Sequence, residues 1–219
     1  MSPAAGGLRE LRTLASAYAD RTPVSSVAVV GNAPLEPSDE RASMIDGADL
    51  VIRMNSFVMD RQGAAACQGG RADVVLWSRL APATPDLFDR YSERLYVLLE
   101  PMRMFGRPEM WPSSWPTDLG FVVARNDTVA IPLNDEIGLP WREQHLAPTT
   151  GTTGVWLALN LFPEAEVRIA GLSFVDDPGQ TRWAHQFGDD VRVGPEHRIA
   201  EEARLIRTWL GTGRARMVR

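Results

Sequence analysis

Short apolar runs with strand-like composition alternate with helical patterns along the chain. The runs are rich in Val, Ile and Leu and lie at 27–30, 50–54, 73–77, 95–99, 121–124 and 167–170. Apolar residues at helical spacing predict helices over 8–19, 38–46, 85–93, 151–162 and 196–210. Strands that are apolar on both faces and joined by helical crossovers are typical of parallel sheets. The pattern predicts an α/β, Rossmann-like single domain with a mostly parallel central sheet flanked by helices.

The same pattern predicts where a ligand site lies. In parallel α/β sheets, ligands bind beyond the carboxyl ends of the strands. The chain has 219 residues, of which 44% are hydrophobic, which is enough for one compact core. We therefore expect one domain over 1–219, with its site at the carboxyl edge of the sheet.

Composition and charge exclude several classes of partner. A formal charge of -5 and a pI near 5.3 give no basic surface for nucleic acid. No apolar run approaches the ~20 residues of a membrane span, and the N-terminus does not resemble a signal peptide. The single cysteine, Cys67, agrees with a reducing compartment. We expect a cytoplasmic protein, and its 23 basic residues, all arginine, are typical of a bacterium with a GC-rich genome.

Asparagine follows two of the predicted strands. Asn32 comes after Gly31 in "VAVVGNAPL", and Asn55 ends "VIRMN". Gly31 lets the backbone approach a ligand closely, and the two amides are suited to gripping one nucleotide. A lone asparagine after a strand more commonly closes a turn, but the paired placement favours a site. A Rossmann dinucleotide site is disfavoured because G-x-G-x-x-G is missing, and a Walker A site is excluded because the chain has no lysine.

Hydroxyls and glycines precede a strongly apolar helix in "PTTGTTGVWLALNLF", residues 148–162. Free N–H groups at such a helix start bind anions, reinforced by the helix dipole. The candidate anion site consists of Thr149, Thr150, Gly151 and Thr152. An ordinary threonine N-cap explains the same residues equally well.

Two of the histidines, His185 and His197, lie in the C-terminal part of the chain. His197 follows Pro195, which marks a helix start, where the positive end of the helix dipole disfavours an imidazolium. A neutral imidazole is a usable general base. A single histidine is more often structural, and we assign His145 to that class.

Together, these segments resemble the sialylmotifs of glycosyltransferase family 29, the eukaryotic-type sialyltransferases. Residues 27–57, with Gly31-Asn32 and an ending in Arg53-Met54-Asn55, resemble the large motif. Pro148-Thr149-Thr150-Gly151 resembles the core of the small motif.

The two shorter sialylmotifs follow in the same order. His185 lies where the third motif has a histidine near the donor phosphate, and His197 with Glu202 matches the very small motif. The cysteine pair that joins the large and small motifs of animal enzymes is absent, as are their anchor and stem. The chain therefore resembles a short bacterial relative of that family.

The resemblance implies the sialyltransferase variant of the GT-A fold and inverting transfer of a sugar from a CMP-linked donor to an acceptor hydroxyl. His197 would be the general base, and His185 with the Thr149–Thr152 helix start would hold the departing phosphate. No cofactor and no metal are implied, and the sequence has no D-x-D triplet. The acidic partner of His197 is open: Glu202 fits the family spacing and is slightly preferred, whereas Glu201 would share a helix face with His197.

Two other functions stay open. A shortened site that admits water would hydrolyse CMP-sugars or nucleoside monophosphates, and a protein without turnover would be a CMP-binding module. A further hypothesis concerns the Pro-rich interval 100–118, where Trp111 and Trp115 would form an aromatic lid over the sugar. Core packing is the more common role of such tryptophans.

Overall fold

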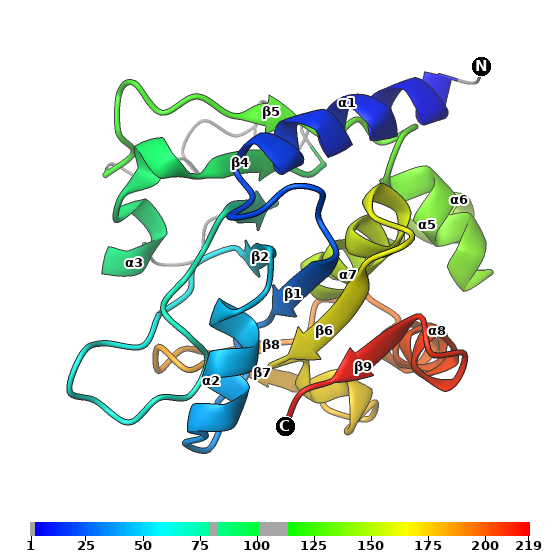
Figure 1. Ribbon diagram of the computed structural model, residues 1–219. Coiled ribbons are helices and arrows are strands. Elements are labelled where there is room, and N and C mark those ends of the chain that lie inside the picture. Colours follow the sequence, from blue (N-terminus) through cyan, green and yellow to red (C-terminus); the bar gives the residue numbers. More distant parts are fainter. Residues whose placement is uncertain (1–2, 79–82, 101–113) are drawn as a thin grey trace.

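The computed structural model describes residues 3–78, 83–100 and 114–219, with side chains from residue 5 onward. Its main feature is one seven-stranded sheet in the order β5-β4-β3-β2-β1-β6-β9. All neighbouring strands in this sheet are parallel (Figure 1). The strands of the sheet are β1 (Ser26–Val30), β2 (Leu50–Met54), β3 (Val74–Trp77), β4 (Leu95–Leu98), β5 (Val122–Val123), β6 (Glu166–Ala170) and β9 (Ala215–Met217).

Helices join the strands, and one antiparallel hairpin lies outside the main sheet. The α-helices are α1 (Pro3–Ala17), α2 (Asp39–Asp46), α3 (Pro85–Phe88), α5 (Ala130–Ile137), α6 (Trp141–Gln144), α7 (Thr150–Leu161) and α8 (Ile199–Gly211). Two short 3-10 helices are η1 (Tyr91–Glu93) and η3 (Ser173–Val175), and the hairpin pairs β7 (Arg182–Ala184) with β8 (Asp190–Arg192). The predicted α/β fold, with a parallel central sheet flanked by helices, is thus confirmed.

Helices cover both faces of the sheet because alternate strand residues point to opposite sides. On one face, Val29 and Ile52 pack with α1, α5, α7 and α8. On the other face, Val51 packs with α2 and Val75 packs with α3. Helix α7 is buried over nearly its whole length, which explains its apolar sequence.

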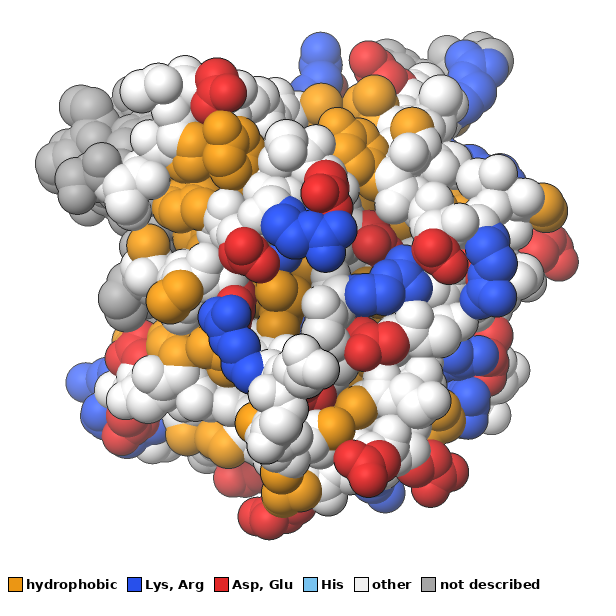
Figure 2. All heavy atoms as spheres, turned by 60° about the vertical axis from the view of Figure 1, so that its left-hand side comes forward, with side chains coloured by type: hydrophobic (Ala, Val, Ile, Leu, Met, Phe, Trp, Pro, Cys, Tyr) orange, Lys and Arg blue, Asp and Glu red, His pale blue; other side chains and the backbone are white. Residues whose placement is uncertain are grey.

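The distribution of charged side chains on the surface agrees with the absence of a basic excess in the composition. On the face in Figure 2, positive and negative side chains of the described residues are interspersed rather than gathered into a patch of one sign. In the described parts of the chain, no helix combines the length and hydrophobicity needed to cross a membrane.

Candidate active site

A cavity of about 210 Å³ lies at the carboxyl edge of the sheet. Its walls come from the residues that follow β1, β2, β3, β4 and β6, from the start of α7, from the β7–β8 hairpin and from the segment before α8. Most of the residues proposed from the sequence line it: Asn32, Asn55, Thr149, Thr150, Gly151, His185 and His197. The fold therefore brings together segments that are far apart in the sequence.

The two asparagines hold neighbouring strand ends and also face the cavity. The Asn32 Nδ2 donates to the Met54 carbonyl at 2.9 Å, which ties the end of β1 to the end of β2. The Asn55 Nδ2 donates to the Thr150 Oγ1 at 3.3 Å, and its Oδ1 accepts from the Ser78 N–H at 3.2 Å. Asn55 has a φ of 52°, a left-handed conformation that asparagine tolerates better than most residues. Each amide thus has a structural partner and further capacity for a ligand.

Gly31 has a role different from the one its position suggested. It does not line the cavity, and a Cβ placed on it would lie 2.2 Å from the carbonyl oxygen of Gly171. Gly171 has a φ of 67°, and a Cβ placed on it would in turn clash with the backbone of Gly31. The close approach of two backbone segments beyond β1 and β6 therefore requires a residue without a side chain at this position.

The start of α7 is capped from two directions. Thr149 is the N-cap, and its Oγ1 accepts from the Thr152 N–H at 3.1 Å. The carboxylate of Glu202 accepts at one oxygen, Oε2, from the Thr149 N–H, the Thr149 Oγ1 and the Thr152 Oγ1, at 2.8, 2.7 and 2.6 Å. Glu202 is 1% exposed, so these bonds replace the water that the carboxylate has lost. Thr152 is consequently buried behind the cap and does not line the cavity.

The N–H groups of Thr150 and Gly151 remain open. In the described parts of the chain, neither N–H has a hydrogen-bond acceptor, whereas those of Thr149 and Thr152 are used by the cap. Thr150 and Gly151 both line the cavity. Two adjacent open N–H groups at the positive end of a helix dipole are suited to an anion, as the sequence predicts.

His185 belongs to the hairpin loop that closes one side of the cavity. The loop is fixed to the sheet because the Gln186 N–H donates to the Asn32 carbonyl at 2.8 Å. The His185 ring stacks on Phe187, with ring centroids 4.9 Å apart, and its Nδ1 lies 3.6 Å from the Asp189 Oδ2. These contacts present the imidazole to the cavity from the side of β1.

His197 lies two residues before α8, and its tautomer follows from its hydrogen bond. Its Nδ1 is 2.8 Å from the Ala147 carbonyl oxygen, which can only accept, so Nδ1 carries the proton. In the neutral ring, Nε2 is then the basic nitrogen. The carboxylate of Glu196 lies 3.9 Å from that Nε2. The Ala147 N–H donates back to the Glu196 carbonyl at 3.0 Å, so the two segments fix each other.

The expected pairing of His197 with Glu202 is not the observed one. In the described residues, the hydrogen-bond partners of Glu202 are Thr149 and Thr152. The reason is that α8 begins only at Ile199, which turns Glu202 toward α7 and the buried layer. The carboxylate beside His197 is Glu196, and Glu201 is half-buried on α8.

The fold was compared with those of solved structures. One crystal structure of a mammalian sialyltransferase, in complex with Gal-beta-1-3GalNAc-ortho-nitrophenol, superimposes with a TM-score of 0.53 at 17% identity. The match covers 98% of this chain and 78% of the other. A second mammalian sialyltransferase structure gives a TM-score of 0.52 at 18% identity, covering 89% and 69%.

The fold is similar to that of mammalian sialyltransferases. The scan against protein-family models and the search of curated proteins find no match. At such low identity the similarity concerns the sialyltransferase fold alone. The roles of individual residues must be argued from the geometry of the site.

Several residues that line the cavity were not predicted from the sequence. Ser78 and Glu100 follow β3 and β4, so the signal that found Asn32 and Asn55, a polar residue after a buried strand, applied to them as well. Phe174 and Trp183 form an aromatic wall, with ring centroids 5.9 Å apart in an edge-to-face arrangement. Their pairing depends on the hairpin folding back, which no local pattern reveals.

The lid hypothesis receives no support from Trp115. Its ring packs against Trp77 at 4.9 Å and against Phe88 at 5.5 Å between centroids, beside a buried cluster on the α3 face of the sheet. Trp115 is therefore half-buried and packs against the core on that face. Trp111 lies outside the described residues.

Proposed function

We propose that this protein is a CMP-sugar-dependent inverting glycosyltransferase with His197 as the general base. The observation that carries the proposal is that one cavity contains both a histidine with a basic Nε2 and two open helix N–H groups. The first is suited to taking a proton from an acceptor hydroxyl. The second is suited to holding a phosphate. The similarity in fold to sialyltransferases supports the same assignment.

The reaction balances with these groups alone. The acceptor oxygen attacks the anomeric carbon while its proton passes to the His197 Nε2. The bond from that carbon to the phosphate oxygen breaks, and CMP leaves with the negative charge. The N–H groups of Thr150 and Gly151, together with His185, stabilise this developing charge, the kind of term that often dominates catalysis. No metal ion and no cofactor take part in the proposal.

The remaining predicted residues bind or support the donor. Asn32 and Asn55 contact the nucleotide with their remaining hydrogen-bond capacity, and Thr149 shapes the turn beside the phosphate. Gly31, Thr152 and Glu202 act indirectly, by allowing the Gly171 contact and by capping α7. We propose that residues 1–219 work as one nucleotide-sugar-binding domain in the bacterial cytoplasm, in agreement with the single cysteine.

Nucleotide binding tests the proposal first. Calorimetry with CMP, UMP, AMP and GMP should show a preference for CMP, and Thr150→Pro, which removes one open N–H, should weaken CMP binding. The matched control is Asp39→Pro, the same type of change at the exposed first residue of α2, outside the cavity, where proline is tolerated. Equal affinity for the four nucleotides would contradict a CMP-sugar enzyme.

Product analysis separates the proposed function from its alternatives. The protein is incubated with CMP-sialic acid and the neutral acceptor Gal-beta-1-3GalNAc-ortho-nitrophenol. A glycosylated acceptor with free CMP identifies a transferase, whereas free sugar identifies a hydrolase of CMP-sugars. Release of free base from a nucleoside monophosphate identifies the other hydrolase, and CMP binding without turnover identifies a binding module.

A further inference from the structure

A small side chamber adjoins the main cavity at the ends of β4 and β5. Its volume is about 20 Å³, and its polar lining includes Glu100 and Asn126. Ser78, Glu100, Pro148 and Thr150 line both spaces, so the chamber opens beside the α7 start. A water molecule needs roughly 10–15 Å³ of such space, so the chamber admits a single substituent of a ligand and not a ring.

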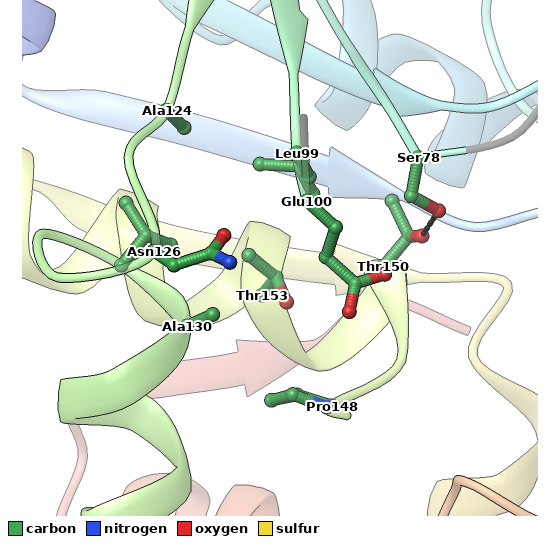
Figure 3. A pocket seen from close by; sticks show the side chains of 10 residues that line it. Ser78, Leu99, Glu100, Ala124, Asn126, Ala130, Pro148, Thr150 and Thr153 are labelled. Carbon is green, nitrogen blue, oxygen red and sulfur yellow. Dashed lines mark hydrogen bonds between the residues drawn. The ribbon is translucent and has the colours of Figure 1, made fainter. Parts of the chain in front are cut away.

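Glu100 and Asn126 supply the polar chemistry of the chamber. Both residues line the chamber, and Figure 3 shows the Asn126 amide and the Glu100 carboxylate on either side of Thr153, with Pro148 below them. The Thr153 Oγ1 already donates to the Thr149 carbonyl at 2.9 Å. The Asn126 amide has no hydrogen-bond partner within the described part of the chain, so it can both donate and accept.

The backbone at Glu100 is unusual in the same way as at Asn55. Glu100 has a φ of 49° and Asn55 has a φ of 52°. The left-handed conformation is uncommon for a residue such as glutamate and is concentrated at functional sites. Both residues stand at the carboxyl ends of parallel strands and line the cavity.

The order of strands places the chamber away from the proposed nucleotide. In the sheet, β4 is separated from β1 by β3 and β2, and neighbouring strands lie about 4.8 Å apart, which gives roughly 14 Å. The His185 loop is fixed to Asn32 at the end of β1, and the open N–H groups of α7 lie between these positions, beside Asn55. A donor with its nucleotide near β1 and its phosphate at α7 therefore leaves the β4 end to the acceptor.

We propose that Glu100, together with Asn126, selects an uncharged hydroxyl-bearing sugar as the acceptor. This inference rests on the proposed function. A carboxylate accepts from a sugar hydroxyl, and the neighbouring amide donates to that hydroxyl oxygen. The same carboxylate repels an acceptor that carries a carboxylate of its own, so the pair excludes acidic sugars by charge as well as by hydrogen bonding.

Acceptor kinetics test the role of Glu100. Initial rates are measured with CMP-sialic acid and three acceptor classes: a neutral galactoside, its uronic acid and its amino-sugar analogue. In Glu100→Gln and Glu100→Ala, we expect the KM for the neutral acceptor to rise roughly ten- to a hundredfold, the effect of losing a hydrogen bond to a charged group. The preference for neutral over acidic acceptor should fall by about the same factor, while the KM for the donor stays within about twofold.

Two controls show whether the kinetic change is specific to Glu100 and which acceptor hydroxyl it contacts. Glu164→Gln makes the same change on an exposed glutamate outside the cavity and should alter no kinetic constant. Monodeoxy galactosides identify the hydroxyl: one of them should lose affinity in the wild type and lose no more in Glu100→Ala, the non-additivity expected of two groups in contact. An unchanged acceptor KM and unchanged preference in both Glu100 variants would overturn the inference, and so would a raised donor KM with an unchanged acceptor KM. A preference of the wild type for the amino-sugar analogue would also overturn the inference, because Glu100 would then select an ammonium group and not an uncharged sugar.

A binding measurement separates this inference from the proposed function. Saturation-transfer NMR detects the neutral galactoside on the protein without turnover. Galactoside binding that is lost in Glu100→Ala, in a protein that binds no CMP, would support the chamber and contradict the glycosyltransferase. CMP binding with no galactoside binding would contradict the role of the chamber and support the nucleotide site. A melting curve for each variant shows that it is folded.

Discussion

Polar side chains have different roles at the amino edge of the central sheet, where the parallel strands begin, and at its carboxyl edge, where they end. At the amino edge, Asp49 precedes β2 and accepts at Oδ2 from the Ser25 N–H at 2.9 Å and from the Ser26 N–H at 3.0 Å, and at Oδ1 from the Arg21 Nε at 2.7 Å. Asp73 precedes β3 and accepts from the Val51 N–H at 2.7 Å. These carboxylates have their hydrogen-bond partners within the protein.

At the carboxyl edge, the polar side chains keep capacity for a ligand. Asn32 and Asn55 each use part of their amides, and the α7 start leaves two N–H groups open. Polar groups with all partners in place stabilise a fold, whereas polar groups with spare capacity beside a cavity are candidates for binding. The comparison predicts that substitutions at the carboxyl edge change function and that substitutions at the amino edge change stability.

The largest effect is expected for His197→Ala. Losing a general base should lower turnover by a factor of ~10²–10⁴, while CMP binds nearly as well as to the wild type, because the base faces the acceptor. An activity assay and a CMP titration measure the two quantities. His145→Ala is the matched control, since His145 is exposed and outside the cavity. Full activity of His197→Ala would mean that the base is another residue.

A smaller effect, on binding itself, is expected for His185→Ala. A charge-assisted hydrogen bond to phosphate contributes about 1.5–3 kcal/mol, so CMP affinity should fall roughly ten- to a hundredfold and turnover should fall as well. Calorimetry on the variant and on His145→Ala measures the difference. If affinity and melting temperature fell together, His185 would belong with the structural groups of the molecule.

Asp49→Asn tests the amino edge. Burial acts to raise the pKa of Asp49, but hydrogen bonds from Ser25, Arg21 and Ser26 more than offset it and hold the pKa well below its ordinary value. Replacing the carboxylate should lower the free energy of unfolding by about 2 kcal/mol and the melting temperature by roughly 4–8 °C. CMP affinity should not change. Asp20→Asn, on an exposed neighbour, is the control.

The pH dependence of that stability has a definite sign. Because the pKa of Asp49 is lowered by folding, its contribution is fully present above the unfolded pKa near 3.9 and is lost as the pH falls below that value. The wild type should therefore lose stability below about pH 4 more steeply than Asp49→Asn. Parallel curves of stability against pH for the two proteins would show that the carboxylate contributes nothing.

The smallest effect is expected on chelation. CMP affinity and turnover should stay within about twofold of their values after treatment with EDTA, because the proposed phosphate site uses N–H groups and a histidine rather than a divalent ion. In the described ranges, no three His, Cys, Asp or Glu side chains are grouped so that they could hold a metal ion. A tenfold loss that magnesium or manganese restores would contradict the prediction.

The fold could be predicted from the sequence where the pattern is strong. The run 50–54 coincides with β2, and the helix expected at 151–162 is found at Thr150–Leu161. Helix α5 could not be predicted because Pro132 interrupts its pattern, although proline is tolerated in the first turn. Strands β7 and β8 are short and half-exposed, so their composition gives little signal.

Part of the cavity lining was predictable from the sequence, but the hydrogen-bond partners of those residues were not. A polar residue after a buried strand identified Asn32 and Asn55 because parallel strands end at one edge. The bond between Thr149 and Glu202 joins residues 53 positions apart, and it depends on where α8 begins. The spacing His197 to Glu202 therefore suggested a pair, whereas packing directs Glu202 to another helix.

The order of polar residues along the sheet edge has a consequence for how such a protein diverges. Asn32 and Glu100 stand on strands separated by two others, roughly 14 Å apart, and changes at sites farther apart than about 7–10 Å usually combine additively. Under the roles proposed above, a substitution at the β4 end alters which acceptor is used without disturbing the nucleotide at β1. New acceptor preferences are then reachable by single steps, each of which keeps an active enzyme, and a library randomised at position 100 is the direct way to observe them.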